Sequence, residues 1–288
     1  MRVATSTNII SSHRARKRVP MIEFIPFLSE KFKILDLNFC EMMNPDSLLL
    51  TDQYKSYVGS LIEYRNKYDL EYNQCHAPYT HGYFELPKNR QERLNWEIER
   101  SIEMAGMLDI PYVVLHSATD KNNYENSFEA NLKWLKSFVK LAKVHNTSIA
   151  LENLTYDKSG QVEFTSQAEE LVQLIEALDS DNVGACYDFG HANMVAKNHK
   201  ENILTLGEHL KCTHVADNNG IDDQHLMPFH GTVPWEKCID ALKKINYKGD
   251  FTYEIMFFSE NIPQEVHKEF LDYAYSVADH LVKRFNES

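Results

Sequence analysis

Six short apolar runs of this chain end on a histidine or a carboxylate. Each run is rich in Val, Ile, Tyr, Phe or Leu, residue types that favour strands, and its last side chain is one that binds metals or moves protons. Such endings converge in space only if the strands are parallel and lie side by side. The pattern therefore predicts a barrel with a metal site at its mouth. The six runs are Tyr72–His76, Val113–His116, Ile149–Glu152, Val183–Asp188, Lys211–His214 and Phe251–Glu254.

Helical patterns separate the strand-like runs. In Asp52–Tyr68, for example, Tyr54, Tyr57, Val58 and Leu61 recur at steps of three and four residues, as expected for one face of a helix. Strands that alternate with helices predict parallel βαβ units, and about eight such units are typical of a (β/α)8 TIM barrel of the α/β class. An open, doubly wound sheet would not bring the ends of six strands to one centre. The other elements expected are a strand at Phe32–Phe39 and helices at Pro20–Glu30, Asn89–Leu108, Ser127–His145, Ser166–Leu178, Trp235–Ile245 and Gln264–Phe285.

Charge and composition narrow the class of protein. The 42 acidic residues outnumber the 30 basic ones, for a net charge of −12, which disfavours a passive surface for polyanions unless a local basic patch or bound cations reverse it. No apolar run approaches the roughly 20 residues of a membrane span, and the first residues lack the features of a secretory leader. The five scattered cysteines show no CxxC spacing and resemble reduced core residues. We therefore expect a cytoplasmic protein with no membrane partner, and the absence of a linker-like segment predicts that residues 1–288 form a single domain.

Three strand-end motifs carry most of the argument for a metal site. Glu152 ends the apolar run IALEN, where an unpaired buried carboxylate would be costly, so it is expected to hold a metal or to pair with a neighbouring loop. Asp188 and His191 form D-x-x-H just after a strand. Both can face the barrel mouth, or the aspartate can cap a helix while the histidine lies on the surface. His214 ends the next run, and an imidazole beside carboxylates suits zinc and similar ions.

Further candidates lie at the same predicted edge. Glu254 ends the last run, while His76 and His116 close the third and fourth strands. Asp223 and His225 form D-x-H in the loop after His214. Any one of these residues can be an ordinary satisfied polar side chain, but chance is a poor explanation for all of them together. The set predicts that these residues bind substrate or additional metal ions.

Other features have two interpretations. The basic stretch His13–Arg18 follows the first strand and could bind a phosphate or form a solvated charged loop. The aromatic residues Tyr79, Tyr83 and Phe84 could line a pocket or pack in the core, whereas Trp235 is expected to begin a helix and pack. The remaining histidines lack a partner pattern and are expected at the surface: His145, His199, His209, His267 and His280.

These motifs resemble those of the xylose-isomerase-like TIM-barrel superfamily, which contains sugar and sugar-phosphate isomerases and epimerases. The resemblance covers nearly the whole chain, through HAPY, LEN, DFGHAN, HVADN, DxHLxP and YEI. It implies that one divalent ion, Mn²⁺ or Zn²⁺, is held by Glu152, Asp188, His214 and Glu254. It also implies that Glu152 and Glu254 exchange a proton with a ketose or sugar phosphate through an enediolate, while His191 binds substrate oxygens.

The same superfamily includes the endonuclease IV branch, whose members use three zinc ions to cleave DNA at abasic sites. Its full ligand set has a match here, so the resemblance leaves a phosphodiesterase as an alternative. A barrel that binds an inositol-type ligand without turnover, or a dehydratase acting on one, is a third interpretation. The matching ligands are His76, His116, Glu152, Asp188, His191, His214, Asp223, His225 and Glu254.

Two features favour the sugar interpretation. The loop DDQHLMPFHGTVPW is close to the D-x-H-L-x-P-G-x-G-x-x-P-W pattern of isomerase-like members, although Phe229 replaces its first glycine, which leaves the local loop geometry open. The later loops lack an obvious array of Arg and Lys, which ordinarily supplies much of the affinity for a DNA backbone. We therefore expect a small sugar as substrate, with nucleic acid disfavoured. The apolar-faced helix Gln264–Phe285 is a candidate contact for a homo-oligomer.

Overall fold

The strands of the protein form one parallel sheet that closes on itself. The computed structural model describes residues 1–10, 19–195, 197–256, 259 and 262–287, so the basic stretch His13–Arg18 lies outside the described residues. The sheet has eight strands in the order β7-β6-β5-β4-β3-β2-β1-β8. They are β1 (Val3–Ser6), β2 (Ile34–Asn38), β3 (Glu71–His76), β4 (Tyr112–His116), β5 (Ser148–Glu152), β6 (Val183–Asp188), β7 (Leu210–His214) and β8 (Phe251–Tyr253).

The two edges of the sheet meet between β7 and β8. A parallel bridge joins Val215 to Tyr253, and the Val215 amide donates a hydrogen bond to the Thr252 carbonyl at 2.8 Å. The Glu254 amide donates in turn to the Val215 carbonyl at 3.1 Å. The predicted TIM barrel is therefore confirmed, and the carboxyl ends of its strands surround one mouth.

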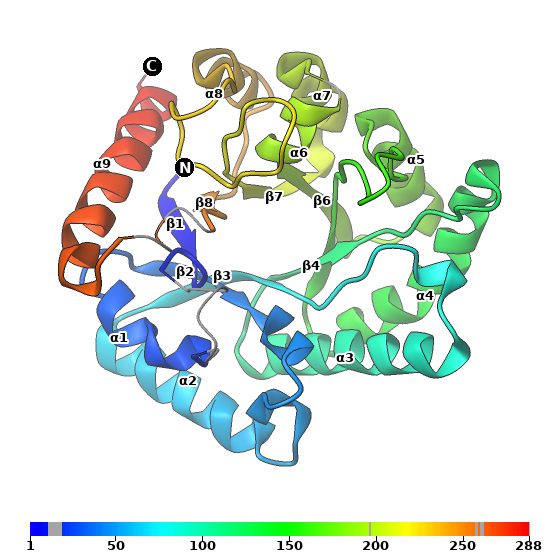
Figure 1. Cartoon of the computed structure of the whole chain (residues 1–288), viewed down its shortest axis with the longest axis horizontal. Coiled ribbons are helices and arrows are strands. Elements are labelled where there is room, and N and C mark those ends of the chain that lie inside the picture. Colours follow the sequence, from blue (N-terminus) through cyan, green and yellow to red (C-terminus); the bar gives the residue numbers. More distant parts are fainter. Residues whose placement is uncertain (11–18, 196, 257–258, 260–261, 288) are drawn as a thin grey trace.

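Helices surround the barrel, as Figure 1 shows. The expected helix Pro20–Glu30 is reduced to a 3-10 turn at Met21–Glu23 and one short helix, because Pro26 supplies no amide hydrogen for a longer one. Two short helices that the sequence did not predict, Phe189–Met194 and His199–Leu206, lie between β6 and β7, and the other predicted helices are found within about three residues of their expected bounds. The helices are α1 (Ile25–Leu28), α2 (Tyr54–Tyr68), α3 (Lys88–Met107), α4 (Ser127–Val144), α5 (Ala168–Leu178), α6 (Phe189–Met194), α7 (His199–Leu206), α8 (Trp235–Lys244) and α9 (His267–Asn286).

The expectation that His199 lies at the surface is wrong. It begins α7, a short helix between β6 and β7 that the periodicity did not reveal, and it is 1% exposed. Its Nδ1 lies 3.1 Å from the Tyr187 hydroxyl, and its ring stacks on Phe189. Packing of α7 against α5 and α8 turns this first residue inward, which a sequence pattern of eight residues cannot show.

The barrel interior is apolar on one side and polar on the other. Inward-facing positions alternate along each strand, and a small apolar cluster of Val114, Ala150, Cys186 and Cys212 fills the side formed by β4 to β7. The other side contains polar residues because the pairing of β2 with β3 shifts: Leu35 pairs with Tyr72, but Asp36 pairs with Gln74. The extra residue, Asn73, is buried together with Asp36, Gln74 and Thr252.

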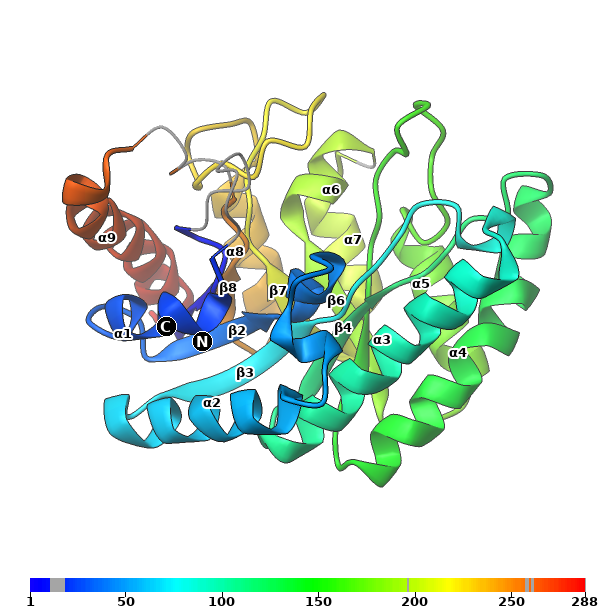
Figure 2. The same ribbon diagram turned by 60° about the horizontal axis from the view of Figure 1, so that its bottom comes forward.

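The loops that follow the strands rise on one side of the barrel, as the segments after β5 and β7 show in Figure 2. All five cysteines have free thiols, and all except Cys40 are buried. Among the described residues, no helix combines the length and apolarity needed to cross a membrane.

Candidate metal centre

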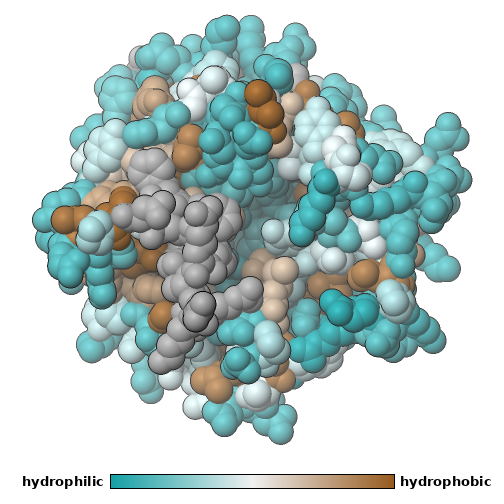
Figure 3. All heavy atoms as spheres, viewed as in Figure 1, coloured by the Kyte–Doolittle hydropathy of each residue, from teal (hydrophilic) through white to brown (hydrophobic). Residues whose placement is uncertain are grey.

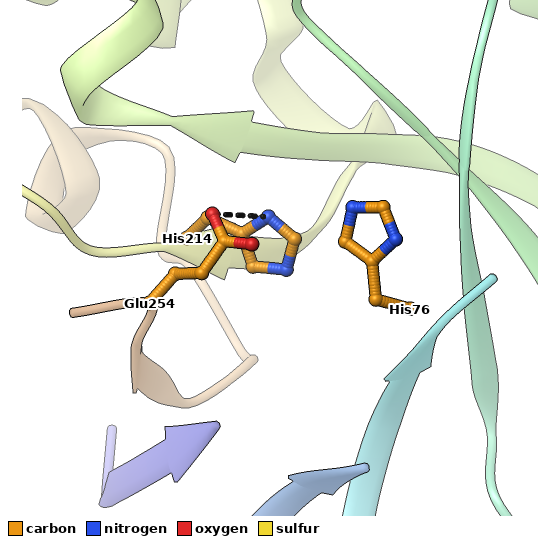
Figure 4. A group of neighbouring side chains, drawn as sticks. All are labelled: His76, His214 and Glu254. Atoms are coloured by element: carbon orange, nitrogen blue, oxygen red, sulfur yellow. Dashed lines mark ion pairs between the residues drawn. The ribbon is translucent and has the colours of Figure 1, made fainter. Parts of the chain in front are cut away.

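Four predicted ligands meet at the barrel mouth. Glu152, Asp188 and His214 are the last residues of β5, β6 and β7, and Glu254 follows β8 by one residue. Because the strands are parallel, these ends lie at one edge, and one ligand atom from each residue lies within 4.8 Å of the others. All four residues are buried. Figure 4 shows two of them, His214 and Glu254, with His76 from β3.

The carboxylate of Glu152 lies at the centre of the group. Its Oε2 is 3.2 Å from His76 Nε2 and 3.1 Å from His116 Nε2, and its Oε1 is 3.0 Å from His214 Nδ1. Burial alone would raise the pKa of Glu152, but the His214 and His116 imidazoles hold it well below its usual range. Glu152 is therefore an ionised carboxylate whose partners are strand-end histidines, in place of the neighbouring-loop partner that the sequence left open.

The two carboxylate oxygens of Asp188 have different surroundings. Its Oδ1 accepts a hydrogen bond from the His191 amide at 2.6 Å and caps α6. Its Oδ2 is buried and has no hydrogen-bond partner among the described residues. Burial raises the pKa of Asp188 to about 7. An unpartnered buried oxygen is costly, and a bound cation beside it would remove that cost.

In three histidines of the site, one ring nitrogen forms a hydrogen bond with a backbone carbonyl oxygen. In each case Nδ1 donates the hydrogen bond, since a carbonyl oxygen can only accept. This arrangement fixes the ring orientation, as is usual for metal-binding histidines. The pairs are His76 with Ala77 (2.8 Å), His191 with Asn153 (2.9 Å) and His225 with Glu254 (2.9 Å).

The remaining nitrogen of each ring faces a carboxylate. His76 Nε2 faces Glu152, while His225 Nε2 and His191 Nε2 lie 3.1 and 3.7 Å from Asp223 Oδ2. Because Nδ1 carries the proton of a neutral ring, Nε2 is an acceptor and so is the carboxylate oxygen that it faces. The two atoms repel each other unless a proton or a metal ion lies between them. Burial alone would lower the pKa of His225, but Asp223 raises it to about 10. Each pair thus favours a positive charge, supplied by a proton or by a metal ion.

The donor set fits a divalent metal. Carboxylate oxygens and imidazole nitrogens are common ligands of Zn²⁺ and Mn²⁺ in proteins, and Asp188 contributes a buried carboxylate to the group whose ligand atoms lie within 4.8 Å of one another. Besides the four-residue group, His76, His116 and Glu152 have ligand atoms within 4.8 Å of one another. The structure therefore brings every predicted site residue to the mouth, with Asp223 and His225 contributed by the loop after β7.

Of the aromatic residues that follow His76, only the first borders the site. The Tyr79 ring stacks on His116, with ring centroids 4.1 Å apart. Tyr83 stacks instead on Trp134 at 4.1 Å, and Phe84 packs edge-on to the same ring. Tyr83 and Phe84 thus pack between β3, α3 and α4. Figure 3 shows a hollow at the centre of the face, bordered largely by hydrophilic residues.

A buried carboxylate that the sequence reading did not identify holds the loop between β7 and α8. Asp217 Oδ1 accepts hydrogen bonds from the amides of Asn218 (2.8 Å) and Val233 (3.0 Å). Its Oδ2 accepts from the Phe229 amide (3.0 Å) and the Trp235 indole (2.9 Å). Trp235 begins α8, as predicted. The loop that carries Asp223 and His225 is thereby closed at its base.

The backbone at Phe229 keeps the conformation that a glycine would adopt, so the replacement changes the residue and not the path of the loop. Phe229 has φ of 71° and is 55% exposed, a left-handed conformation that glycine adopts without strain. The loop retains the conformation suited to glycine although the side chain is large. The hydrogen bond from the Phe229 amide to Asp217 holds it there.

Comparison with known proteins agrees with this geometry. The family described as xylose isomerase-like TIM barrel matches residues 32–272. An uncharacterized protein of Methanocaldococcus jannaschii is 29% identical over 223 residues, which are 75% of this chain and 75% of that protein. The crystal structure of a D-tagatose 3-epimerase-like protein is 25% identical, with a TM-score of 0.73, and the match covers 98% of this chain and 100% of the other. The crystal structure of the IolI protein with a zinc atom is 16% identical and shares the fold, with a TM-score of 0.75 over 99% of this chain and 98% of the other.

Proposed function

Because the chain belongs to the xylose isomerase-like TIM barrel family, we propose that it is a divalent-metal-dependent isomerase or epimerase acting on a ketose. The observation that carries the proposal is the buried group of Glu152, Asp188, His214 and Glu254, whose ligand atoms lie within 4.8 Å of one another. These four residues would hold the ion. The likeness to the D-tagatose 3-epimerase-like protein supports the ketose as substrate class.

The residues around the group fit proton exchange at a carbon next to a carbonyl. A divalent ion bound here would polarise the carbonyl and an adjacent hydroxyl of the sugar. Glu152 and Glu254 come from strands on different sides of the mouth, so one carboxylate can take a proton from one face of the sugar while the other returns it on the opposite face. His191, held by the Asn153 carbonyl, would orient a substrate oxygen.

A second candidate function rests on the additional histidines. His76, His116 and Glu152 form a further potential metal group, and Asp223 faces both His191 and His225. This arrangement is what a cluster of three zinc ions would need, as in an endonuclease IV-like phosphodiesterase acting on abasic DNA. We favour the sugar isomerase because the D-tagatose 3-epimerase-like protein matches this chain over nearly its full length.

The two functions are separated by ion content and by product. Protein purified without added metal is analysed by elemental mass spectrometry, then loaded with Mn²⁺ or Zn²⁺ and incubated with a panel of ketoses in D₂O. The proposal expects about one ion per chain and deuterium at the epimerised or isomerised carbon, detected by NMR, with chelator-treated protein as the control. About three zinc ions with cleavage of an abasic duplex would establish the phosphodiesterase. Ligand-dependent stabilisation without product or exchange for any ketose would contradict the isomerase and favour a barrel that binds its ligand without turnover.

A further inference from the structure

His214 is held differently from the three site histidines whose Nδ1 donates to a backbone carbonyl, namely His76, His191 and His225. Its Nδ1 faces the candidate ligands, at 3.0 Å from Glu152 Oε1 and 3.5 Å from Glu254 Oε2. The ring is therefore reversed relative to His76, which directs Nε2 to the same carboxylate. The Nε2 of His214 points into the barrel, and no backbone carbonyl of the described part of the chain accepts a hydrogen bond from it. The residue that faces this nitrogen is Asp36 of β2, with Oδ2 at 3.5 Å.

Asp36 is a buried carboxylate with little compensation. It is 1% exposed, and Gln74 Nε2 donates a hydrogen bond to its Oδ2 at 3.3 Å. Among the described residues, neither its Oδ1 nor the facing His214 Nε2 has a hydrogen-bond partner. A buried charge in such surroundings costs stability, so a carboxylate at this position calls for a functional explanation.

A chain of hydrogen-bonded polar side chains continues below Asp36. Gln74 accepts a hydrogen bond from Thr252 Oγ1 at 3.4 Å, and Thr252 accepts one from Asn73 Nδ2 at 2.9 Å. Asn73 also reaches Asp250, at 3.4 Å. The shifted pairing of β2 with β3 places both Asn73 and Gln74 inside the barrel. Asp36 is thus the upper end of a polar column that stops beneath His214.

We propose that Asp36 is a positioning residue for the metal centre. With an ion bound, its carboxylate would accept the Nε2–H of His214, which faces Oδ2 at 3.5 Å, and would keep the Nδ1 lone pair directed at the ion. Asp36 would then do for His214 what the backbone carbonyls of Ala77, Asn153 and Glu254 do for His76, His191 and His225. Partners of this kind typically alter metal affinity by 10- to 100-fold. The inference rests on the metal site of the proposed function, although not on the identity of the sugar.

The test measures zinc affinity and metal-free stability in the same variants. Zn²⁺ alone is titrated into metal-free protein in competition with a chelating indicator, for wild type, Asp36→Asn and Asp36→Ala. We expect the Kd for zinc to rise about 10-fold in Asp36→Asn and towards 100-fold in Asp36→Ala. The thermal midpoint of metal-free Asp36→Asn should equal or exceed that of the wild type, because the substitution removes a buried charge. The matched control is Thr252→Val, which removes two hydrogen bonds lower in the column and should lower the midpoint with the zinc Kd unchanged.

The zinc affinities and the thermal midpoints together distinguish a positioning role of Asp36 from a structural one. An unchanged zinc Kd in both Asp36 variants, or an equal loss of affinity in Thr252→Val, would overturn the positioning role. A large fall in the metal-free midpoint of Asp36→Asn with intact affinity would show a merely structural role. Wild-type protein without measurable zinc affinity would overturn the inference together with the metal site. Failure of every ketose to react would leave this measurement valid, because it reads zinc binding and not turnover.

Discussion

Replacing Asp217 with asparagine tests whether one buried carboxylate holds the loop between β7 and α8. The carboxylate is fully buried and accepts four hydrogen bonds, two at each oxygen. Asparagine has almost the same shape but only one oxygen, and its amide group can only donate. Whichever way the side chain turns, two N–H groups then face an NH₂ group. The substitution therefore leaves buried donors without an acceptor at the base of the loop.

The expected cost follows from those two donors. A buried donor without a partner costs about 1–3 kcal/mol, so Asp217→Asn should lower the free energy of unfolding by about 2–6 kcal/mol. Typical domains have only about 5–15 kcal/mol in total, so the loss is large but leaves a folded population to measure. Because Asp223 and His225 lie on this loop, the affinity for additional metal at these residues should fall as well.

Urea unfolding of metal-free protein measures the cost directly, from the midpoint and slope of the transition. The matched control is Asp222→Asn in the same loop, where the exposed Asp222 accepts one hydrogen bond from Asn219 at 3.0 Å. Surface changes of this kind usually stay within about 0.5 kcal/mol. A loss of less than about 1 kcal/mol in Asp217→Asn, or one equal to the control, would refute the assignment of Asp217 as the anchor of the loop.

Three more predictions concern the site and the barrel wall. Glu152→Gln should abolish turnover while the far-ultraviolet circular dichroism stays native, because an amide cannot take a proton; appreciable turnover in this variant would remove Glu152 from the mechanism. Zinc at about 1,000 times its Kd should stabilise the protein by about 4 kcal/mol, and a thermal midpoint insensitive to zinc would contradict a native-state site. Burial lowers the pKa of His199 to about 4, below its usual value of about 6.5, so the native state binds fewer protons there and its stability falls as pH drops from about 6.5 to 4. Relative to His199→Gln, metal-free wild type should lose about 2–3 kcal/mol between pH 7 and pH 4.5 in urea titrations; parallel pH profiles would contradict this.

Much of the architecture follows from local patterns. The predicted carboxyl ends of β3 to β7 coincide with the observed ones, because the apolar run stops where a polar side chain reaches the mouth. The helix α2 was expected at Asp52–Tyr68 and is found at Tyr54–Tyr68, since its apolar face repeats over four turns. Short elements such as α7 lack enough repeats for a period to appear, so the burial of His199 was missed.

The roles of two buried aspartates, Asp36 and Asp217, could not be predicted from the sequence. Asp36 lies inside an apolar run and Asp217 lies in a polar stretch, and neither has a spacing that indicates its role. Asp36 meets His214 across the barrel, and Asp217 meets Trp235 only after the loop folds back. Such contacts depend on strand register and on loop path, which nearby residues do not specify.

The sequence by itself determined the alternation of strands and helices, the barrel, and the residues that reach its mouth. These follow from periodicities of two and 3.6 residues, which each segment expresses through its own side chains. Only the tertiary structure decided which nitrogen of each histidine faces the carboxylates and which buried groups stand behind them. Those features arise from closure of β7 onto β8 and from the shifted pairing of β2 with β3. A shift of a single residue in a strand reverses the side of the sheet that each side chain faces, so these contacts depend on the assembled barrel and not on any one of its segments.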